Sequence, residues 1–432
     1  MVLSASRPSS GPVAGRVRWR WLPQGNVRVI SATNFLTGMY QNILGFVLQP
    51  FVLRFGGGLS LVGLFQALAG RLSGILSALV QPFGGYLADT RGRRKVAMLG
   101  SALAIAAMAL LILAARFQGE PWALPGLVLP GFVCMGLSLV GAPALQSTVA
   151  DSTDPRRRAS AYATTAFFWV LPGALLAIPG GLIADRLGYG AVFGIALAFE
   201  SVNLVLFAKF LRETAPAAEV HPWRERIAQT LHPPREIRGL LFVVALDAST
   251  WGLASGIIYG LAAKEFGFSN AQLGAIAATW ALFFAVFLIP TAVLVNRHGP
   301  KRVIVFSEAL GVPIMVAWLL PWWLDGGLEF FLAASVLNGL TAATWVPAVN
   351  TYVANWTSAE RRAEVLGGLA AFRGLAAFPA PFIGGVLYDA FGYPVPILAN
   401  LVGAAVTTAA IAILLRDPPV HGVGSSPRTP SP

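Results

Sequence analysis

The stretch GGYLADTRGRRK, residues 84–95, decides the fold of this chain. In it an apolar run ends in a glycine-rich turn with one aspartate, and a cluster of arginine and lysine residues follows at once. Helices can cross a bilayer because they satisfy their own backbone groups, and loops rich in lysine and arginine stay on the cytoplasmic side. The stretch therefore predicts the point at which a membrane helix returns to the cytoplasm.

The composition of the 432-residue chain is typical of a protein with many membrane spans. Hydrophobic residues make up 56% and charged residues 12%, about half of the roughly 25% usual in soluble domains. The net charge of +12 lies in short loops between apolar runs, where it sets membrane orientation, so we expect no nucleic-acid partner. The single cysteine, Cys134, excludes an intrachain disulfide, and no metal or nucleotide motif occurs, so we expect no cofactor and no enzymatic activity.

Apolar runs of about 20 residues predict twelve membrane helices. A polar segment rich in charge and proline, residues 212–238, predicts a cytoplasmic linker between six-helix halves at 29–211 and 239–415. We expect the basic segment 1–28 and the tail 416–432 on the cytoplasmic side as well. The predicted helices cover residues 29–55, 61–88, 96–117, 127–150, 161–184, 191–211, 240–266, 273–295, 303–324, 330–354, 363–388 and 395–415.

Loop charge orients these helices. The tails and the loops of one side hold 25 of the 31 lysine and arginine residues, whereas the loops of the other side hold only Arg54, Arg116, Arg186 and Lys264. The bias predicts a multi-pass protein of the cell membrane with both termini in the cytoplasm.

The two halves repeat each other in sequence. Three pairs of strings are separated by 204 residues: PALQ at 143–146 with PAVN at 347–350, RRA at 157–159 with RRA at 361–363, and GxxxDxxGY at 181–189 with the same string at 385–393. The stretch at 84–95 recurs in weaker form at 292–302, with Asn296 in the position of Asp89. Four matches in one order indicate a duplicated six-helix unit.

The spacing Gly85-x-x-x-Asp89-x-x-Gly92-Arg93-Arg94 resembles the signature loop between helices 2 and 3 of the major facilitator superfamily (MFS) of transporters. The resemblance covers nearly the whole chain, apart from both tails. It implies an all-α membrane fold of 12 transmembrane helices in two pseudo-symmetric six-helix bundles, with the substrate site near the bilayer midplane.

The resemblance also implies a gating role for this loop. In the family the aspartate, here Asp89, caps the start of helix 11, and the arginine after the second glycine, here Arg93, pairs with an acid at the end of helix 4, here Asp151. A carboxylate is stabilised at a helix N-terminus, so the cluster is expected to latch the outward-facing state. The alternative, a cluster that only sets topology, explains the arginines but not the glycines and Asp89. Asn296 predicts a weaker latch in the second half.

Helices 1, 4, 7 and 10 line the central cavity in this family, and each carries polar or aromatic residues here. Interhelical hydrogen bonding is the alternative interpretation at each position. The candidates for the substrate pathway are Asn34, Gln41 and Asn42 on helix 1, Gln146 on helix 4, Asp247 and Trp251 on helix 7, and Asn338 and Trp345 on helix 10.

Charges within the predicted spans cost about 2.5–3.5 kcal/mol each on insertion scales, so each suggests a function. Asp247 and Arg373 lie at similar depths on helices 7 and 11, which are neighbours in the family, and we predict that they pair. A static pair would be structural, whereas one broken by substrate or a proton would couple transport. Arg71 is expected to line the pathway or to extend outward, and Glu200 and Glu308 are expected to be structural.

The resemblance implies a secondary transporter that moves a small organic solute by alternating access. Multidrug–proton antiporters of the family often have an acid in helix 1, an arginine in helix 4 and a GPxxGG element in helix 5. This chain lacks the first two and has the third only in part, at residues 177–181, so proton-coupled efflux is left open. We expect a monomer in the lipid bilayer whose arginines favour amphipathic or anionic solutes. A facilitative uniporter and a transport-inactive sensor or scaffold are the alternatives.

Overall fold

The computed structural model describes residues 25–70, 74–154, 157–214, 238–324, 326–356, 369 and 372–416, without the side chains of 159, 289 and 292. Within these ranges the chain is helical and contains no strand. Arg71, most of the predicted linker and the start of predicted helix 11 lie outside the described residues, as do most of the N-terminal segment and the tail beyond Arg416.

The first half begins with one long helix and ends with two. The second and fourth predicted spans, which lie between these long helices in the sequence, are each divided into shorter helices. The elements are α1 (Gly25–Leu53), α2 (Leu59–Ala69), α3 (Ile75–Arg91), α4 (Arg93–Ala114), the π-helical turn η1 (Leu124–Val128), α5 (Leu129–Ser138), α6 (Gly141–Asp151), α7 (Arg158–Leu187) and α8 (Tyr189–Phe210).

The second half follows the same pattern, with its first and third spans divided. The elements are α10 (Arg238–Ser255), α11 (Ile258–Phe266), α12 (Asn270–His298), α13 (Pro300–Ala309), α14 (Gly311–Leu319), the 3-10 turn η4 (Leu320–Trp322), α15 (Leu328–Trp356), α17 (Ala380–Phe391) and α18 (Pro394–Leu414).

The helices have the length and composition of membrane spans. Ten helical stretches among the described residues are long and apolar enough to cross a bilayer. The 29-residue α1 and the α2–α3 pair occupy the positions of the other two predicted spans. The chain is therefore a multi-pass membrane protein of the predicted all-α class.

Four of the predicted spans contain a local interruption of the regular helix, although three of them still form single apolar stretches long enough to cross a bilayer. The seventh predicted span breaks between α10 and α11, where a Cβ on Gly256 would overlap the ring of Pro381 and the Gly252 carbonyl. Small residues and displaced backbone hydrogen bonds are the usual causes of such breaks. Apolar periodicity does not reveal them, because both pieces remain equally apolar. The other interruptions lie at Gly70 and Gly74, at residues 139–140 and at residue 310.

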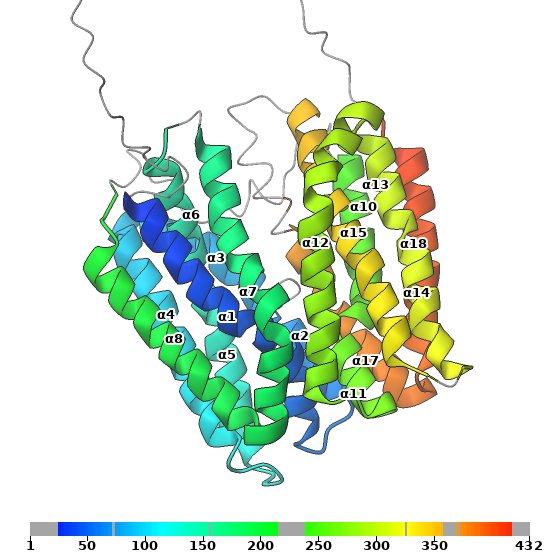
Figure 1. Cartoon of the computed structure of the whole chain (residues 1–432), viewed down its shortest axis with the longest axis horizontal. Coiled ribbons are helices and arrows are strands. Elements are labelled where there is room, and N and C mark those ends of the chain that lie inside the picture. Colours follow the sequence, from blue (N-terminus) through cyan, green and yellow to red (C-terminus); the bar gives the residue numbers. More distant parts are fainter. Residues whose placement is uncertain are drawn as a thin grey trace, which may run out of the picture.

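The two halves stand side by side and meet at one end (Figure 1). At that end α7 packs against α12, and α2 packs against α17. A single hydrophobic core joins the halves there and includes Phe51 of α1, Leu273 of α12 and Tyr393. At the other end, which carries the Arg93 loop and is called the basic end below, each half has separate core clusters of its own. The halves are thus joined at the end opposite the basic loops.

Candidate functional site

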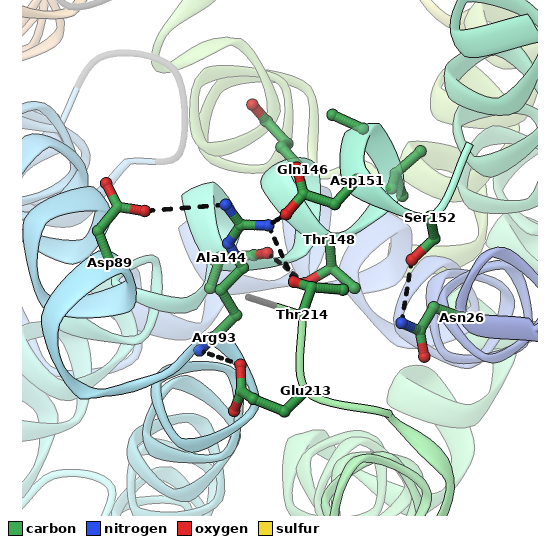
Figure 2. Close-up of polar contacts among 12 residues, drawn as sticks. Asn26, Asp89, Arg93, Ala144, Gln146, Thr148, Asp151, Ser152, Glu213 and Thr214 are labelled. Atoms are coloured by element: carbon green, nitrogen blue, oxygen red, sulfur yellow. Dashed lines mark hydrogen bonds and ion pairs between the residues drawn. The ribbon is translucent and has the colours of Figure 1, made fainter. Parts of the chain in front are cut away.

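The turn between α3 and α4 at the basic end is built around a glycine and a buried arginine. Gly92 has a φ of +99°, a conformation that L side chains rarely adopt, so glycine is required there. Arg93 begins α4 with only 7% of its side chain exposed. Its guanidinium forms an ion pair with Asp151 at the end of α6 and lies 3.9 Å from Asp89 of α3 (Figure 2). The structure therefore contains the predicted Arg93–Asp151 pair.

The segment after α8 completes this cluster. The carboxylate of Glu213 accepts hydrogen bonds from the backbone N–H groups of Arg93, at 2.8 Å, and Arg94, at 3.2 Å, and so caps α4. Arg93 Nη1 also donates to Thr214 Oγ1 at 2.9 Å (Figure 2). Sequence analysis missed Glu213 and Thr214, because nothing in the sequence relates residues separated by about 120 positions. The linker thus begins fixed to the signature loop.

A second tie joins three helix ends beside the cluster. The side chain of Asn26 at the start of α1 donates to Ser152 Oγ at 3.0 Å (Figure 2) and to the carbonyl of Arg212, also at 3.0 Å. Its oxygen accepts from the Arg212 N–H at 2.9 Å. These hydrogen bonds therefore tie the ends of α1, α6 and α8 together beside the loop. The other predicted partner of Asp89, the start of helix 11, lies outside the described residues.

The predicted charge pair within the spans is present. Arg373 Nη2 donates to Asp247 Oδ2 at 3.3 Å, and the two side chains are 40% and 6% exposed. Glu308 of α13 is 5% exposed and lies close enough for its charge to interact with those of Asp247 and Arg373. Glu308, expected to be structural, thus lies beside the pair, a position that its place in the sequence did not indicate.

The two tryptophans predicted for the pathway have different surroundings. Trp251 of α10 is half-buried, and its ring packs on that of Trp318 with centroids 6.4 Å apart. Trp345 of α15 is only 7% exposed and packs in the core of the second half with Val244 and Val349. Asn338, two turns before Trp345 on the same helix, is half-buried. Of Trp251 and Trp345, Trp251 is nearer in sequence to a member of the Asp247–Arg373 pair.

The helix 1 amides face the neighbouring helix α7. Asn34 donates to the carbonyl of Thr165 at 3.0 Å, and Asn42 donates to the carbonyl of Trp169 at 3.2 Å. Gln41 is half-buried on the same helix. Gln146 of α6 is exposed, and its backbone carbonyl accepts a hydrogen bond from the Tyr162 hydroxyl at 3.0 Å. The contacts of Asn34 and Asn42 are those of the alternative interpretation, interhelical hydrogen bonding.

Glu200 of α8 has three donors around it. Tyr40 donates at 2.7 Å, Ser101 at 2.5 Å and Asn203 at 3.0 Å, so this buried carboxylate is well solvated by the protein. These bonds link α1, α4 and α8 and support the structural role expected for Glu200.

Two pockets lie away from the Asp247–Arg373 pair. Two pockets of about 480 and 500 Å³ flank Asp185 at the end opposite the basic loops, and neither is lined by Asp247 or Arg373. No group of three or more histidine, cysteine, aspartate or glutamate side chains that could hold a metal ion occurs in the described part of the chain.

Comparisons with known proteins agree with this architecture. The family model described as Major Facilitator Superfamily matches residues 30–254 and 240–432. Multidrug resistance protein MdtG of Salmonella choleraesuis strain SC-B67 is 25% identical over 372 residues, which is 83% of this chain and 87% of that protein. Crystal structures of a mutant of the nucleoside transporter NupG and of a D-xylose–proton symporter each superpose with a TM-score of 0.70 at 12% identity, covering 91% of this chain and 100% and 99% of theirs.

Proposed function

Because the chain belongs to the major facilitator superfamily of membrane transporters, we propose that it exports a small organic solute by alternating access, in exchange for protons. The charge of the basic end favours a cytoplasmic position, and in the proposed cycle the halves rock about a site between them. Export is favoured by the MdtG relative, which is named a multidrug resistance protein. The observation that carries the proposal is the Asp247–Arg373 pair with Glu308 beside it.

This group of three charges suits exchange of a proton for a solute. Glu308 lies near enough to the Asp247–Arg373 pair for charge interaction with both, and nearby carboxylates do not readily ionise together. Arg373 is 40% exposed, so the group is open on one side rather than sealed in a core. A proton and a cationic group of a solute would therefore compete for the same carboxylates.

The solute class follows from the same contacts. Sequence analysis led us to expect amphipathic or anionic solutes because of the arginines. In the structure the charge of Arg373 is already opposed by Asp247, and a second carboxyl group, that of Glu308, lies beside the pair. The half-buried ring of Trp251 supplies an apolar or cation–π contact one turn from Asp247. We therefore propose neutral or cationic amphipathic solutes, with the pathway through Asp247, Trp251, Asn338 and Arg373.

The test uses purified protein in liposomes loaded with a pH-sensitive dye. A pH gradient is imposed, a panel of cationic, neutral and anionic solutes is added, and the wild type is compared with Asp247→Asn and Glu308→Gln. The control is Glu120→Gln, which removes the same charge at an exposed position far from the pair. Dissipation of the gradient by a cationic or neutral solute in the wild type and the control, but not in the two variants, is the expected result.

Two other outcomes would replace the proposal. Solute flux without proton movement in the wild type would indicate a facilitative uniporter. The absence of flux for every solute would favour a transport-inactive sensor or scaffold. The Arg93 cluster argues against the second, because a protein with no moving halves needs no gating loop.

A further inference from the structure

Two aspartates at the end opposite the basic loops cap helices of the other half. Asp185, at the end of α7, accepts hydrogen bonds from the backbone N–H groups of Asn270 and Ala271 of α12, both at 2.9 Å. Asp389, at the end of α17, accepts from the N–H groups of Leu59 and Ser60 of α2, at 2.9 and 2.8 Å. Each carboxylate thus holds the first turn of a helix from the opposite half, where free N–H groups and the helix dipole favour negative charge.

The two caps belong to the same sequence repeat. Asp185 and Asp389 are the aspartates of the two GxxxDxxGY strings, which are separated by 204 residues. Sequence analysis used these strings as evidence of duplication and gave them no role. In the structure each string caps the start of a helix across the boundary between the halves, so the repeat has produced one contact twice.

Glycines bring the capped helices into backbone contact. A Cβ on Gly181 would overlap the Asn270 carbonyl, and a Cβ on Gly274 would overlap the Ala177 carbonyl. The second interface repeats this arrangement, with Gly385 against Leu59 and Gly63 against Pro381. Reciprocal glycines of this kind allow close approach without filling the interface. The contact can therefore separate without displacing large side chains.

Additional polar contacts reinforce both caps. The side-chain amide of Asn270 donates to Asp185 at 2.8 Å, and Lys264 Nζ lies 3.5 Å from Asp389. Beside Asp389, the Tyr388 hydroxyl donates to Glu265 of α11 at 2.6 Å. Lys264 and Glu265 belong to the same half as Asp389, so they orient the end of α17 toward α2 rather than add a separate contact between halves.

The end of the molecule opposite the basic end is called the outer end here. We propose that Asp185 and Asp389 form a paired latch that keeps this outer end of the transporter closed. This proposal rests on the alternating-access function proposed above. At the basic end the corresponding repeat supplies only one carboxylate, Asp89, because its counterpart is the exposed Asn296. Two carboxylates cap helices at the outer end, whereas the repeat supplies only one at the basic end. This difference favours the state that is closed at the outer end, and that state is the resting state.

The size of the effect follows from the capping interaction. Loss of one carboxylate cap at a partly exposed helix N-terminus lowers the population of the capped state by about twofold to thirtyfold. The two caps lie at separate interfaces and share no residue, so their effects should multiply. Removing both should therefore shift the conformational equilibrium far more than removing either one.

The test measures the distance across the outer end by pulsed electron paramagnetic resonance in lipid nanodiscs. Spin labels are attached in a Cys134→Ser background at Leu187→Cys of the first half and Phe391→Cys of the second. These side chains are 72% and 68% exposed, so labelling there disturbs little packing. In the otherwise unaltered protein we expect one dominant short distance.

Four capping variants are compared. Asp185→Asn and Asp389→Asn should each add a longer distance, and the double variant should make it dominant. Ala271→Pro removes one of the N–H donors while leaving Asp185 in place, and proline is tolerated in the first turn of a helix. It should shift the distribution in the same direction, and it serves as the test if the double variant does not fold. The control Glu120→Gln removes a charge from an exposed loop at the same end and should change nothing.

An unchanged distance distribution in the folded double variant, or in folded Ala271→Pro if the former is lost, would overturn the latch. This readout needs no substrate, so it separates the two proposals. A shifted distribution in a protein that moves no solute would support the latch and remove the proposed function. Transport with unshifted distances would do the reverse.

Discussion

The guanidinium of Arg373 and the carboxylate of Asp247 lie 3.3 Å apart, yet Arg373 is 40% exposed and Asp247 only 6%. The pair is therefore asymmetric: the side chain of Arg373 keeps a large accessible surface, and that of Asp247 is buried. Its two members should respond differently to substitution, which distinguishes this arrangement from a symmetrical buried ion pair.

Arg373→Gln should destabilise the protein more than Asp247→Asn. Without Arg373 the buried carboxylate of Asp247 has no cation beside it. Breaking a fully buried pair lowers the free energy of unfolding by about 3–5 kcal/mol, and because Arg373 is partly exposed we expect a loss of about 1–3 kcal/mol. Without Asp247 the guanidinium can turn toward water, so we expect a loss below about 1 kcal/mol. Thermal unfolding in detergent, followed by tryptophan fluorescence, measures the order. Equal losses in the two variants would show that exposure does not separate the partners.

Glu213→Ala should loosen the signature loop. It removes the cap of α4, a change that typically costs about 1 kcal/mol, with a range of about 0.5–2 kcal/mol. Glu213→Asp keeps the charge on a shorter side chain and should recover part of the loss. Hydrogen exchange of the first turn of α4 reports the effect directly, and unchanged protection of Arg93 and Arg94 in the alanine variant would contradict it.

Gly274→Ala should weaken the contact between the halves at the α7–α12 interface. The added Cβ overlaps the backbone carbonyl of Ala177, which cannot move without its helix. Gly194→Ala is the matched control, because nothing lies within 4 Å of its added Cβ and alanine favours a helix over glycine by about 1 kcal/mol. The distance between spin labels at Leu187→Cys and Phe391→Cys should lengthen in the first variant only.

Glu200→Ala should be the most destabilising of these substitutions. It removes the carboxylate that accepts from Tyr40, Ser101 and Asn203, at about 1–3 kcal/mol for each donor that is left unsatisfied. Ser101→Ala removes one donor and should cost only about 1 kcal/mol. The midpoints of thermal unfolding test this ranking, and a loss in Glu200→Ala no larger than in Ser101→Ala would count against a shared network.

The sequence was sufficient to predict the class of fold and the Asp247–Arg373 pair. Runs of apolar residues located the spans because the bilayer imposes a single length on every crossing. The pair could be predicted because an intramembrane charge requires a partner, and Arg373 lies at the depth of Asp247 on a helix that the family resemblance makes its neighbour.

Contacts that depend on the relative position of the two halves were not predictable in this way. The repeat revealed Asp185 and Asp389, but the helices they cap are specified only by the packing of one half on the other. For Trp345 the sequence was misleading. Its position on helix 10 suggested that it lines the pathway, whereas its ring is buried in the core. Periodicity gives a face of a helix and cannot tell which neighbour covers it.

The break between α10 and α11 is bridged by a side chain of the other half. Gln49 of α1 donates to the carbonyl of Gly256 at 3.0 Å and accepts from the N–H of Gly260 at 2.7 Å, replacing hydrogen bonds that an unbroken helix would make internally. The contacts between the halves therefore do not follow the boundary of the sequence repeat. Within helix 7, α11 is thus tied by two hydrogen bonds to the first half, at the point where its internal bonding to α10 is interrupted.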